Sequence, residues 1–273
     1  PYWRGVLETE AWQPHKDSGL VAGDLQYTTA KLGRALTRQL TDQLAPRTRA
    51  TPQELLLAAA SQVMARCCRQ SAIRLFVERH GREPGSAGLD ISRTVGWFTS
   101  ISPITLQLDG DQTPPSLIRR TKETLRAVPD KGIGYGLLRY GREANGLEVP
   151  AEEIESGLLF NYLGVIDQGR SSDCFRMVRP LQLNRSLSCP VRFAWQIDAW
   201  IGNGELTISL HSADSSDIVN KMLGVICDWL GSDAAEQSSA VSVTDFPLAN
   251  LNDSQLDKLS RLLADKDAGK TEE

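Results

Sequence analysis

Ionisable side chains are clustered at the end of one predicted strand. The apolar run IRLFV, residues 73–77, has the length and composition of a buried strand, and Glu78, His80 and Arg82 come next. A free glutamate, with a pKa of about 4.3, is a weak base at neutral pH. Partial burial would raise this pKa, and a neighbouring arginine would oppose the increase. Two interpretations are therefore open: Glu78 exchanges protons, or it pairs with Arg82 and closes the loop.

A second polar pair lies in another predicted strand, GLLFNYL, residues 157–163. Side chains alternate between the two faces of a strand, so Asn161 and Tyr162 should point to opposite sides. The phenol of Tyr162 could donate a proton or orient a substrate, or it could be an ordinary half-buried strand tyrosine. Asn161 could fix a loop. Tyr162 therefore joins Glu78 as a candidate for proton-transfer chemistry, and Asn161 is a candidate for a supporting role.

Metal and nucleotide sites are not expected. The three histidines, His15, His80 and His211, are far apart and lack the spacing of metal ligands. The five cysteines include no C-x-x-C pair. Dinucleotide-binding glycines follow a strand and open a long helix. The glycines of PDKGIGYG, residues 129–136, lack this arrangement.

The composition is that of an ordinary globular chain. Of 273 residues, 41% are hydrophobic and 23% are charged, and the net charge of −4 comes without a basic patch, which argues against nucleic acid as a partner. No apolar run approaches the roughly 18 residues of a membrane span. The odd number of cysteines suggests a reducing compartment, so we expect a cytoplasmic protein. The opening PYWRGVLETEAW, which has no starting methionine, suggests a piece of a longer polypeptide.

Two helices are predicted in the first quarter of the chain. Leucines at four-residue spacing predict a helix from Thr28 to about Leu44. The next helix should begin at Pro52, because Thr51 and Glu54 can form a capping box. The sequence that follows, LLLAAASQVMARCC, is apolar nearly all round, which predicts a helix buried within the fold.

Strands and helices then alternate, which predicts an α/β fold with a mixed sheet flanked by helices. Residues 193–201 and 205–211 should pair as a hairpin across Gly202-Asn203-Gly204. We divide the chain into a lobe, residues 1–231, and a segment 232–273 that contains a linker, a short helix and a charged tail. Other strands are expected at 73–77, 101–108 and 157–163, and other helices at 115–127, around Leu137, at 217–230 and at 254–263.

Four local patterns, in order, carry a family resemblance. They are ERHGRE (78–83), RTVGWFTSISPITL (93–106), PDKGIGYG (129–136) and FNYLG (160–164). Together they resemble the successive motifs of epimerization domains of nonribosomal peptide synthetases: E-G-H-G-R-E, R-T-V-G-W-F-T before a Tyr-Pro strand, P-x-x-G-x-G-Y-G and F-N-Y-L-G. The resemblance covers residues 2–263. Condensation domains share the fold but typically have G-x-F-x-N-T where this chain has GWFTS, and no counterpart of F-N-Y-L-G.

The resemblance implies a fold and a reaction. The fold would be the C-terminal lobe of a chloramphenicol-acetyltransferase-like domain. The reaction would convert an L-aminoacyl or peptidyl thioester to its D form by removing the Cα proton and returning it on the opposite face. The domain would have no cofactor of its own, because a carrier protein presents the substrate on its phosphopantetheine arm. The expected partners are a peptidyl carrier protein, the N-terminal lobe and other synthetase modules.

The resemblance also assigns roles to residues. Glu78 and Tyr162 would be the catalytic pair and would reach a common cleft. Asn161 would contact the arm or fix a loop, His80 would shape its motif through a hydrogen bond to the backbone, and Arg82 would form an ion pair with Glu83 in the same loop. Trp97 and Phe98 could line the channel for the arm or pack in the core.

The chain departs from the family pattern in three ways. Arg79 replaces the glycine that follows the motif glutamate, and Ser102 replaces the tyrosine before Pro103. The histidine motif H-H-x-x-x-D of the family's first half does not occur in this sequence. We therefore expect the isolated chain to have little or no activity.

Two alternatives remain open. The chain could be a lobe of a condensation-type acyltransferase, which would need the same histidine motif. It could also be a non-catalytic module that docks carrier or partner proteins, with the charged segment 253–266 as a contact helix.

Overall fold

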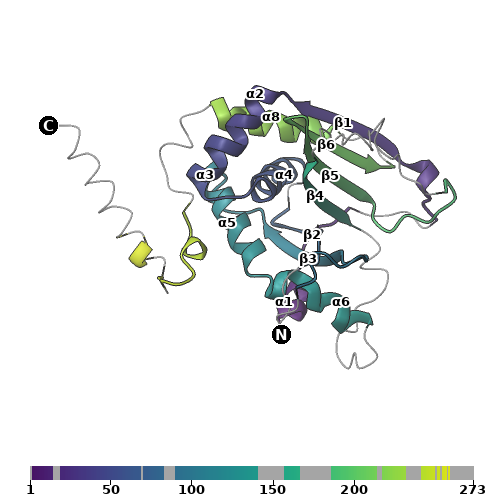
Figure 1. Cartoon of the computed structure of the whole chain (residues 1–273), viewed down its shortest axis with the longest axis horizontal. Helices are drawn as coiled ribbons and strands as arrows, with labels where there is room; N and C mark the ends of the chain where they lie inside the picture. Colours follow the sequence, from purple (N-terminus) through teal and green to yellow (C-terminus); the bar gives the residue numbers. More distant parts are fainter. Residues whose placement is uncertain are drawn as a thin grey trace.

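The structure, a computed structural model, is built on one six-stranded sheet in the order β1-β6-β5-β4-β2-β3 (Figure 1). It describes residues 2–14, 19–68, 70–82, 90–140, 157–166, 186–213, 217–231, 241–249, 251–252, 254–256 and 258. The strands are β1 (Gln26–Leu32), β2 (Ala72–Arg79), β3 (Ser100–Gln107), β4 (Leu158–Ile166), β5 (Trp195–Gly202) and β6 (Glu205–Ser212).

The sheet is mixed, as predicted. Strand β4 runs parallel to both β2 and β5, and the other neighbouring pairs are antiparallel. The three parallel strands therefore end at the same edge of the sheet. Glu78 lies at that end of β2, and FNYLG lies in β4.

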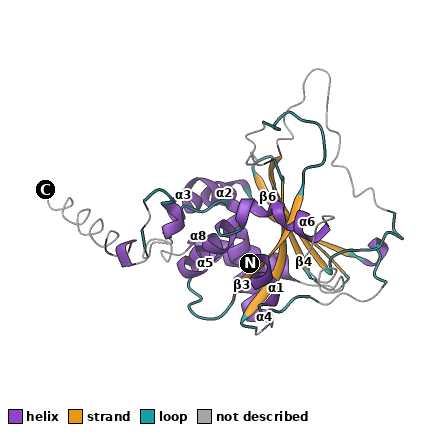
Figure 2. Cartoon of the chain, turned by 90° about the horizontal axis from the view of Figure 1, so that it is seen from below, coloured by secondary structure: helices purple, strands orange, loops and turns teal. Residues whose placement is uncertain are grey.

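Helices cover one face of the sheet, which Figure 2 shows from a second direction. This layer contains α2 (Arg34–Arg38), α3 (Ala45–Thr48), α4 (Pro52–Cys68), α5 (Pro114–Arg126) and α8 (Ile218–Gly231). The short helices α1 (Tyr2–Glu8) and α6 (Ile133–Tyr140) lie beside the edge strand β3. Among the described helices, none is both long and apolar enough to cross a bilayer.

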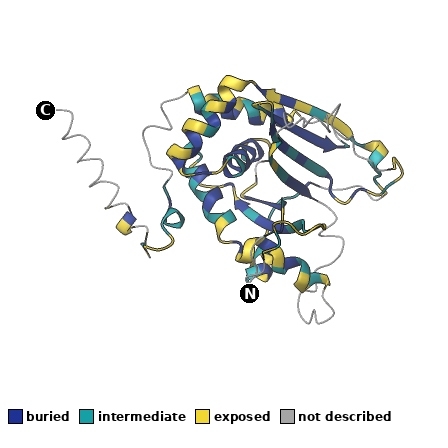
Figure 3. Cartoon of the chain, in the orientation of Figure 1, coloured by how far each residue is buried: buried dark blue, intermediate teal, exposed yellow. Residues whose placement is uncertain are grey.

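Helix α4 is the centre of the helical layer and is buried over most of its length (Figure 3). Its start confirms the predicted capping box: the backbone N–H of Thr51 donates to Glu54 Oε2 at 2.7 Å, and that of Glu54 donates to Thr51 Oγ1 at 3.2 Å. Such a cap contributes about 1 kcal/mol. Because the helix is apolar on nearly all sides, it packs between α5, α8 and the sheet.

The prediction of one helix from Thr28 to Leu44 is wrong in its first part. Residues 26–32 form β1, which pairs with β6 along its whole length. The β-branched Thr28 and Thr29 favour a strand. Ala30 and Leu32, two positions apart, are buried against the helical layer. The helix begins only at Arg34 and continues through the wider turns of η2 (Gln39–Leu44).

The remaining expected elements are confirmed where the structure describes them. The hairpin β5–β6 turns at Asn203 and Gly204, whose φ angles of 53° and 76° are those that a tight hairpin turn requires. PDKGIGYG forms the short helix η3 (Pro129–Gly132) and enters α6. Helix α1 was not predicted, and most of the expected helix 254–263 and the charged tail lie outside the described residues.

The segment after α8 contacts the lobe again. Ser242, in front of η5 (Val243–Asp245), is fully buried, and its hydroxyl donates to Glu123 of α5 at 2.7 Å. Asp245 forms ion pairs with Lys122 and Arg126 of the same helix. The division of the chain at residues 231/232 stays a prediction, but at least residues 242–245 are anchored to the lobe.

Candidate functional site

Glu78 and Asn161 lie side by side at the end of the parallel strands. They are partners in the pairing of β2 with β4, and Asn161 is in turn paired with Asp198 of β5. Residues in register across a sheet point to the same face. Glu78, Asn161 and Asp198 therefore form a polar row on the face opposite the helices, and all three are partly exposed.

Tyr162 points to the other face. Its partner in β5 is Ala199, which is fully buried under the helical layer. Because side chains alternate along β4, Tyr162 cannot leave the sheet on the same side as Glu78. The expectation that these two side chains reach a common cleft is thus corrected: the residue that shares the face of Glu78 is Asn161. Burial raises the pKa of the Tyr162 hydroxyl above its ordinary value of 10.0.

The sheet opens immediately beyond this row. The pairing of β2 with β4 ends at Glu78 and Asn161. Along β4 and β5 the register shifts between Tyr162 and Val165, and Gly164 has a φ of 77°. Glu78 is therefore the last residue of β2 that pairs with β4, at the point where these two strands separate. A group in this position can contact a molecule that approaches from the end of the sheet.

His80 and Arg82 shape the loop that follows Glu78. The Nδ1 atom of His80 accepts a hydrogen bond from the backbone N–H of Arg82 at 2.9 Å, which is the motif-shaping contact expected for it. Arg82 donates to the carbonyl oxygens of Ile91 and Thr94 at 2.7 and 2.8 Å, and its guanidinium lies 4.4 Å from the centre of the Phe98 ring. Arg82 thus ties the first motif to the second. Its expected partner Glu83 lies outside the described residues.

Gly81 allows this close approach of the two motifs. Its φ is 64°, and a Cβ at this position would lie 1.7 Å from the carbonyl oxygen of Phe98. Within the second motif Phe98 is half-buried, whereas Trp97 is 90% exposed. Trp97 therefore does not pack in the core of the described lobe, and its place along a channel for the arm stays a prediction.

A further polar pair on the same face was not predicted from the sequence. His211 Nε2 lies 3.5 Å from Asp198 Oδ2, and Gln196 donates to the same oxygen at 2.9 Å. The ring of Tyr27 packs edge-on against His211, with 4.6 Å between the ring centres. The signal in the sequence is a single ionisable residue in each of the two strand segments WQIDAW and LTISLH.

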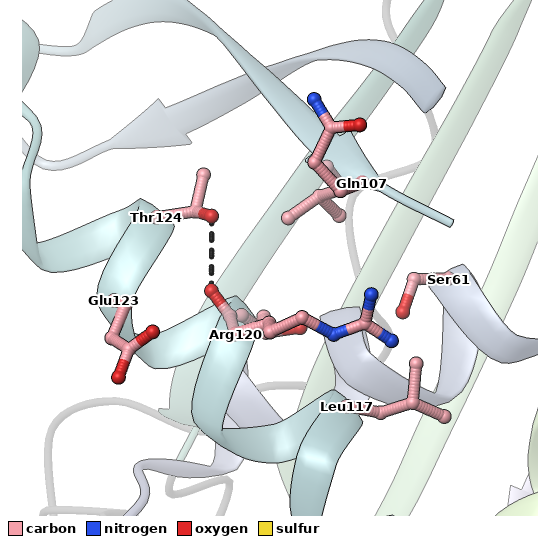
Figure 4. Close-up of a pocket in the computed structure, with 8 residues that line it drawn as sticks. Ser61, Gln107, Leu117, Arg120, Glu123 and Thr124 are labelled. Atoms are coloured by element: carbon pink, nitrogen blue, oxygen red, sulfur yellow. Dashed lines mark hydrogen bonds between the residues drawn. The ribbon is translucent and has the colours of Figure 1, made fainter. Parts of the chain in front are cut away.

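A cavity formed by the described residues lies away from this site. The cavity in Figure 4, of about 120 Å³, lies where α4, α5 and β3 meet. In the view, the Arg120 side chain extends toward Ser61, and Thr124 bonds to the Arg120 carbonyl oxygen at 2.9 Å. None of the predicted site residues lines it. In the part of the chain that the structure describes, no three His, Cys, Asp or Glu side chains come together as metal ligands.

Comparisons with known proteins agree on a family. The family model described as "Condensation domain" matches residues 1–216. The chain is 30% identical over 275 residues to a linear gramicidin synthase of Brevibacillus parabrevis, and the alignment covers 94% of this chain and 5% of that protein. The chain thus spans a small part of the relative that it matches.

Two solved structures are similar. One is the epimerization domain from the third module of tyrocidine synthetase B, with 27% identity and a TM-score of 0.70 over 86% of this chain and 54% of that chain. The other is the condensation domain from the monacolin K polyketide synthase, with 14% identity and a TM-score of 0.58 over 87% of this chain and 57% of that chain. Both likenesses confirm the predicted chloramphenicol-acetyltransferase-like fold.

Proposed function

Because this chain belongs to the condensation-domain family, we propose that it acts on a thioester carried by the phosphopantetheine arm of a carrier protein. We propose further that it is the C-terminal lobe of an epimerization domain. The F-N-Y-L-G and P-x-x-G-x-G-Y-G patterns support this branch of the family. Of the two solved domains compared above, the epimerization domain is the nearer in sequence and in fold.

The observation that carries the proposal is the register of Glu78 and Asn161 at the end of the parallel strands. Epimerization at Cα needs a base, an acid on the opposite face of the substrate, and a donor to the developing enolate oxygen. In the proposal, the carboxylate of Glu78 takes the Cα proton while the electron pair moves into the thioester carbonyl. The amide N–H of Asn161, on the same face, donates to the oxygen or to the arm.

The proton that completes the reaction comes from the opposite side of the substrate. We expect its donor to be the histidine motif of the N-terminal lobe, which faces Glu78 across the bound arm. Return of a proton on that side gives the D configuration. In this proposal each lobe supplies one proton-transfer group, so this chain without the other lobe has little or no activity.

Analysis of the product tests the proposal. A carrier protein is loaded with an L-aminoacyl or peptidyl thioester and incubated with the complete domain that contains this chain. We expect a mixture of L and D residues on the carrier, and no change of configuration with this chain alone. Formation of a peptide bond between two carriers, with no D residue, would favour the acyltransferase alternative. Full turnover by this chain alone would contradict the proposed division between the lobes.

Substitutions at Asn161 and Tyr162 show which of these two residues acts together with Glu78. Asn161→Ala removes a donor on the face of Glu78, and we expect the epimerization rate to fall about 10²-fold, as for the loss of one oxyanion donor. Tyr162→Phe removes only a hydroxyl on the other face, so we expect a fall of less than about tenfold. Initial rates of D-residue formation measure both. A large loss in Tyr162→Phe with little loss in Asn161→Ala would restore Tyr162 as the catalytic partner of Glu78.

A further inference from the structure

The two residues that replace family residues within the motifs contact each other. Arg79 and Ser102 are 23 positions apart, and Arg79 Nη1 donates to Ser102 Oγ at 2.9 Å. In the pairing of β2 with β3, Ser102 faces Val77, the residue two before Arg79. Arg79 and Ser102 therefore lie diagonally on one face, opposite to the face of Glu78.

The PDKGIGYG turn fills the remaining space around this contact. Ser102 is only 1% exposed. A Cβ at Gly132 would lie 2.3 Å from Ser102 Oγ and 3.2 Å from Arg79 Nη1, so the turn packs directly on both side chains. With Arg79 and the turn in place, the larger side chain of a tyrosine at position 102 has no room.

The turn itself has an unusual backbone. Asp130, Lys131 and Gly132 have φ angles of 45°, 50° and 90°, and two of these residues are not glycine. Such conformations persist only where the surroundings hold them. Beyond the turn, Tyr135 of α6 packs against Trp3 of α1, with 5.2 Å between the ring centres. Because Gly132 packs directly on Arg79 and Ser102, the position of the turn depends on the side chains at these two sites.

We propose that Arg79 and Ser102 are a matched pair that takes the place of the family's glycine and tyrosine. The pair fixes the position of the turn at Gly132 and holds the end of β2 that carries Glu78. Arg79 is thus a positioning residue, and its role rests on the proposed function of Glu78. The hydrogen bond keeps the guanidinium on the face away from the carboxylate. The serine supplies both the acceptor and the space that the arginine needs.

A double-mutant cycle tests the pair without any assay of activity. Arg79→Gly, Ser102→Tyr and the double variant are made in the full chain, and the midpoint of thermal unfolding is measured. We expect Ser102→Tyr alone to lower the midpoint by roughly 5–10 °C through overpacking, and the double variant to recover at least half of that loss. Additive effects would overturn the proposal. If neither tyrosine variant folds, Ser102→Ala replaces Ser102→Tyr in the same cycle, and additivity there has the same consequence.

The positioning role is tested in the complete domain. Arg79→Gly should lower kcat for epimerization roughly tenfold per folded domain with KM unchanged, because Glu78 is less well held. Arg79→Lys, which keeps a donor toward Ser102, should restore most of kcat. A loss in the amount of folded protein with unchanged kcat would assign Arg79 a structural role only. A wild-type domain that does not epimerize would refute the proposed function, while the unfolding cycle would still decide on the matched pair.

Discussion

Replacing Glu78 by glutamine is expected to lower the rate of D-residue formation by about 10²- to 10⁴-fold, the usual contribution of a general base. Glutamine has nearly the same shape as glutamate but cannot accept the Cα proton. The pairing of β2 with β4 does not involve this side chain, so the sheet and Asn161 should stay in place. We therefore expect kcat to fall and KM to change little.

The matched control is Glu10→Gln, which makes the same chemical change at an exposed position before β1. Rates are measured on a loaded carrier protein with the complete domain. Retention of more than about a third of the wild-type rate in Glu78→Gln would contradict the role of base. It would favour the interpretation that Glu78 is a structural residue of the loop.

Asp245→Asn is expected to have the largest effect on stability. The side chain of Lys122 is fully buried, and its Nζ contacts Asp245 Oδ2 and the carbonyl oxygen of Thr48, each at 2.8 Å. Arg126 bridges Asp245 to Glu54, whose Oε1 lies 2.8 Å from Arg126 Nε. Removing one partner of a buried ion pair leaves an uncompensated charge and costs about 3–5 kcal/mol.

The free energy of unfolding in urea, with Asp228→Asn on the exposed side of α8 as control, measures this effect. A loss below about 1 kcal/mol would show that the segment 242–245 is not held through Lys122.

The effect of Asp245 should depend on pH in a defined direction. Burial raises the pKa of Asp245, but hydrogen bonds from Lys122, from the backbone of Ser242 and from Arg126 outweigh it and hold the pKa below its ordinary value of 3.8. A carboxyl group with a lowered pKa in the folded state stabilises the fold above its unfolded pKa, and the contribution is lost as the pH falls through the folded pKa. The difference between wild type and Asp245→Asn should therefore shrink below about pH 4.

Burial of the Lys122 amine opposes the stabilisation that this network provides. Burial lowers the pKa of Lys122 despite the contact with Asp245, so the charged amine is costly to bury. The network is therefore better understood as an anchor for the segment 242–245 than as a large net source of stability. Contact with the lobe continues just past this segment, because the guanidinium of Arg49 lies 4.5 Å from the centre of the Phe246 ring.

Local sequence signals predicted much of the fold. The capping box at Thr51 and the asparagine-glycine turn between β5 and β6 each depend on a few neighbouring residues, so their sequences predict them directly. The region 28–32 failed because its leucine spacing fits a helix, whereas pairing with β6, a contact of distant residues, makes it a strand. Helix α1 lacks a clear apolar period.

The site was less predictable, since it depends on which strands are neighbours. Asn161 and Tyr162 alternate by sequence alone, but only the pairing of β4 with β2 shows that Asn161 shares the face of Glu78. Arg79 and Ser102 were each noted as a departure, and their contact follows from the antiparallel register of β2 and β3. Asp198 and His211 were missed because their proximity follows from the antiparallel pairing of β5 with β6 and belongs to no local sequence motif.

Exchange of the Cα proton with solvent tests the central claim most directly. The loaded carrier protein and the complete domain are incubated in deuterated water, and the carrier-bound residue is analysed for mass and configuration. We predict that the wild-type domain incorporates deuterium at Cα as the D form appears. In Glu78→Gln we expect no measurable deuterium incorporation and no measurable formation of the D form. Deuterium incorporation at the wild-type rate in Glu78→Gln, or peptide-bond formation without exchange in the wild type, would contradict the account.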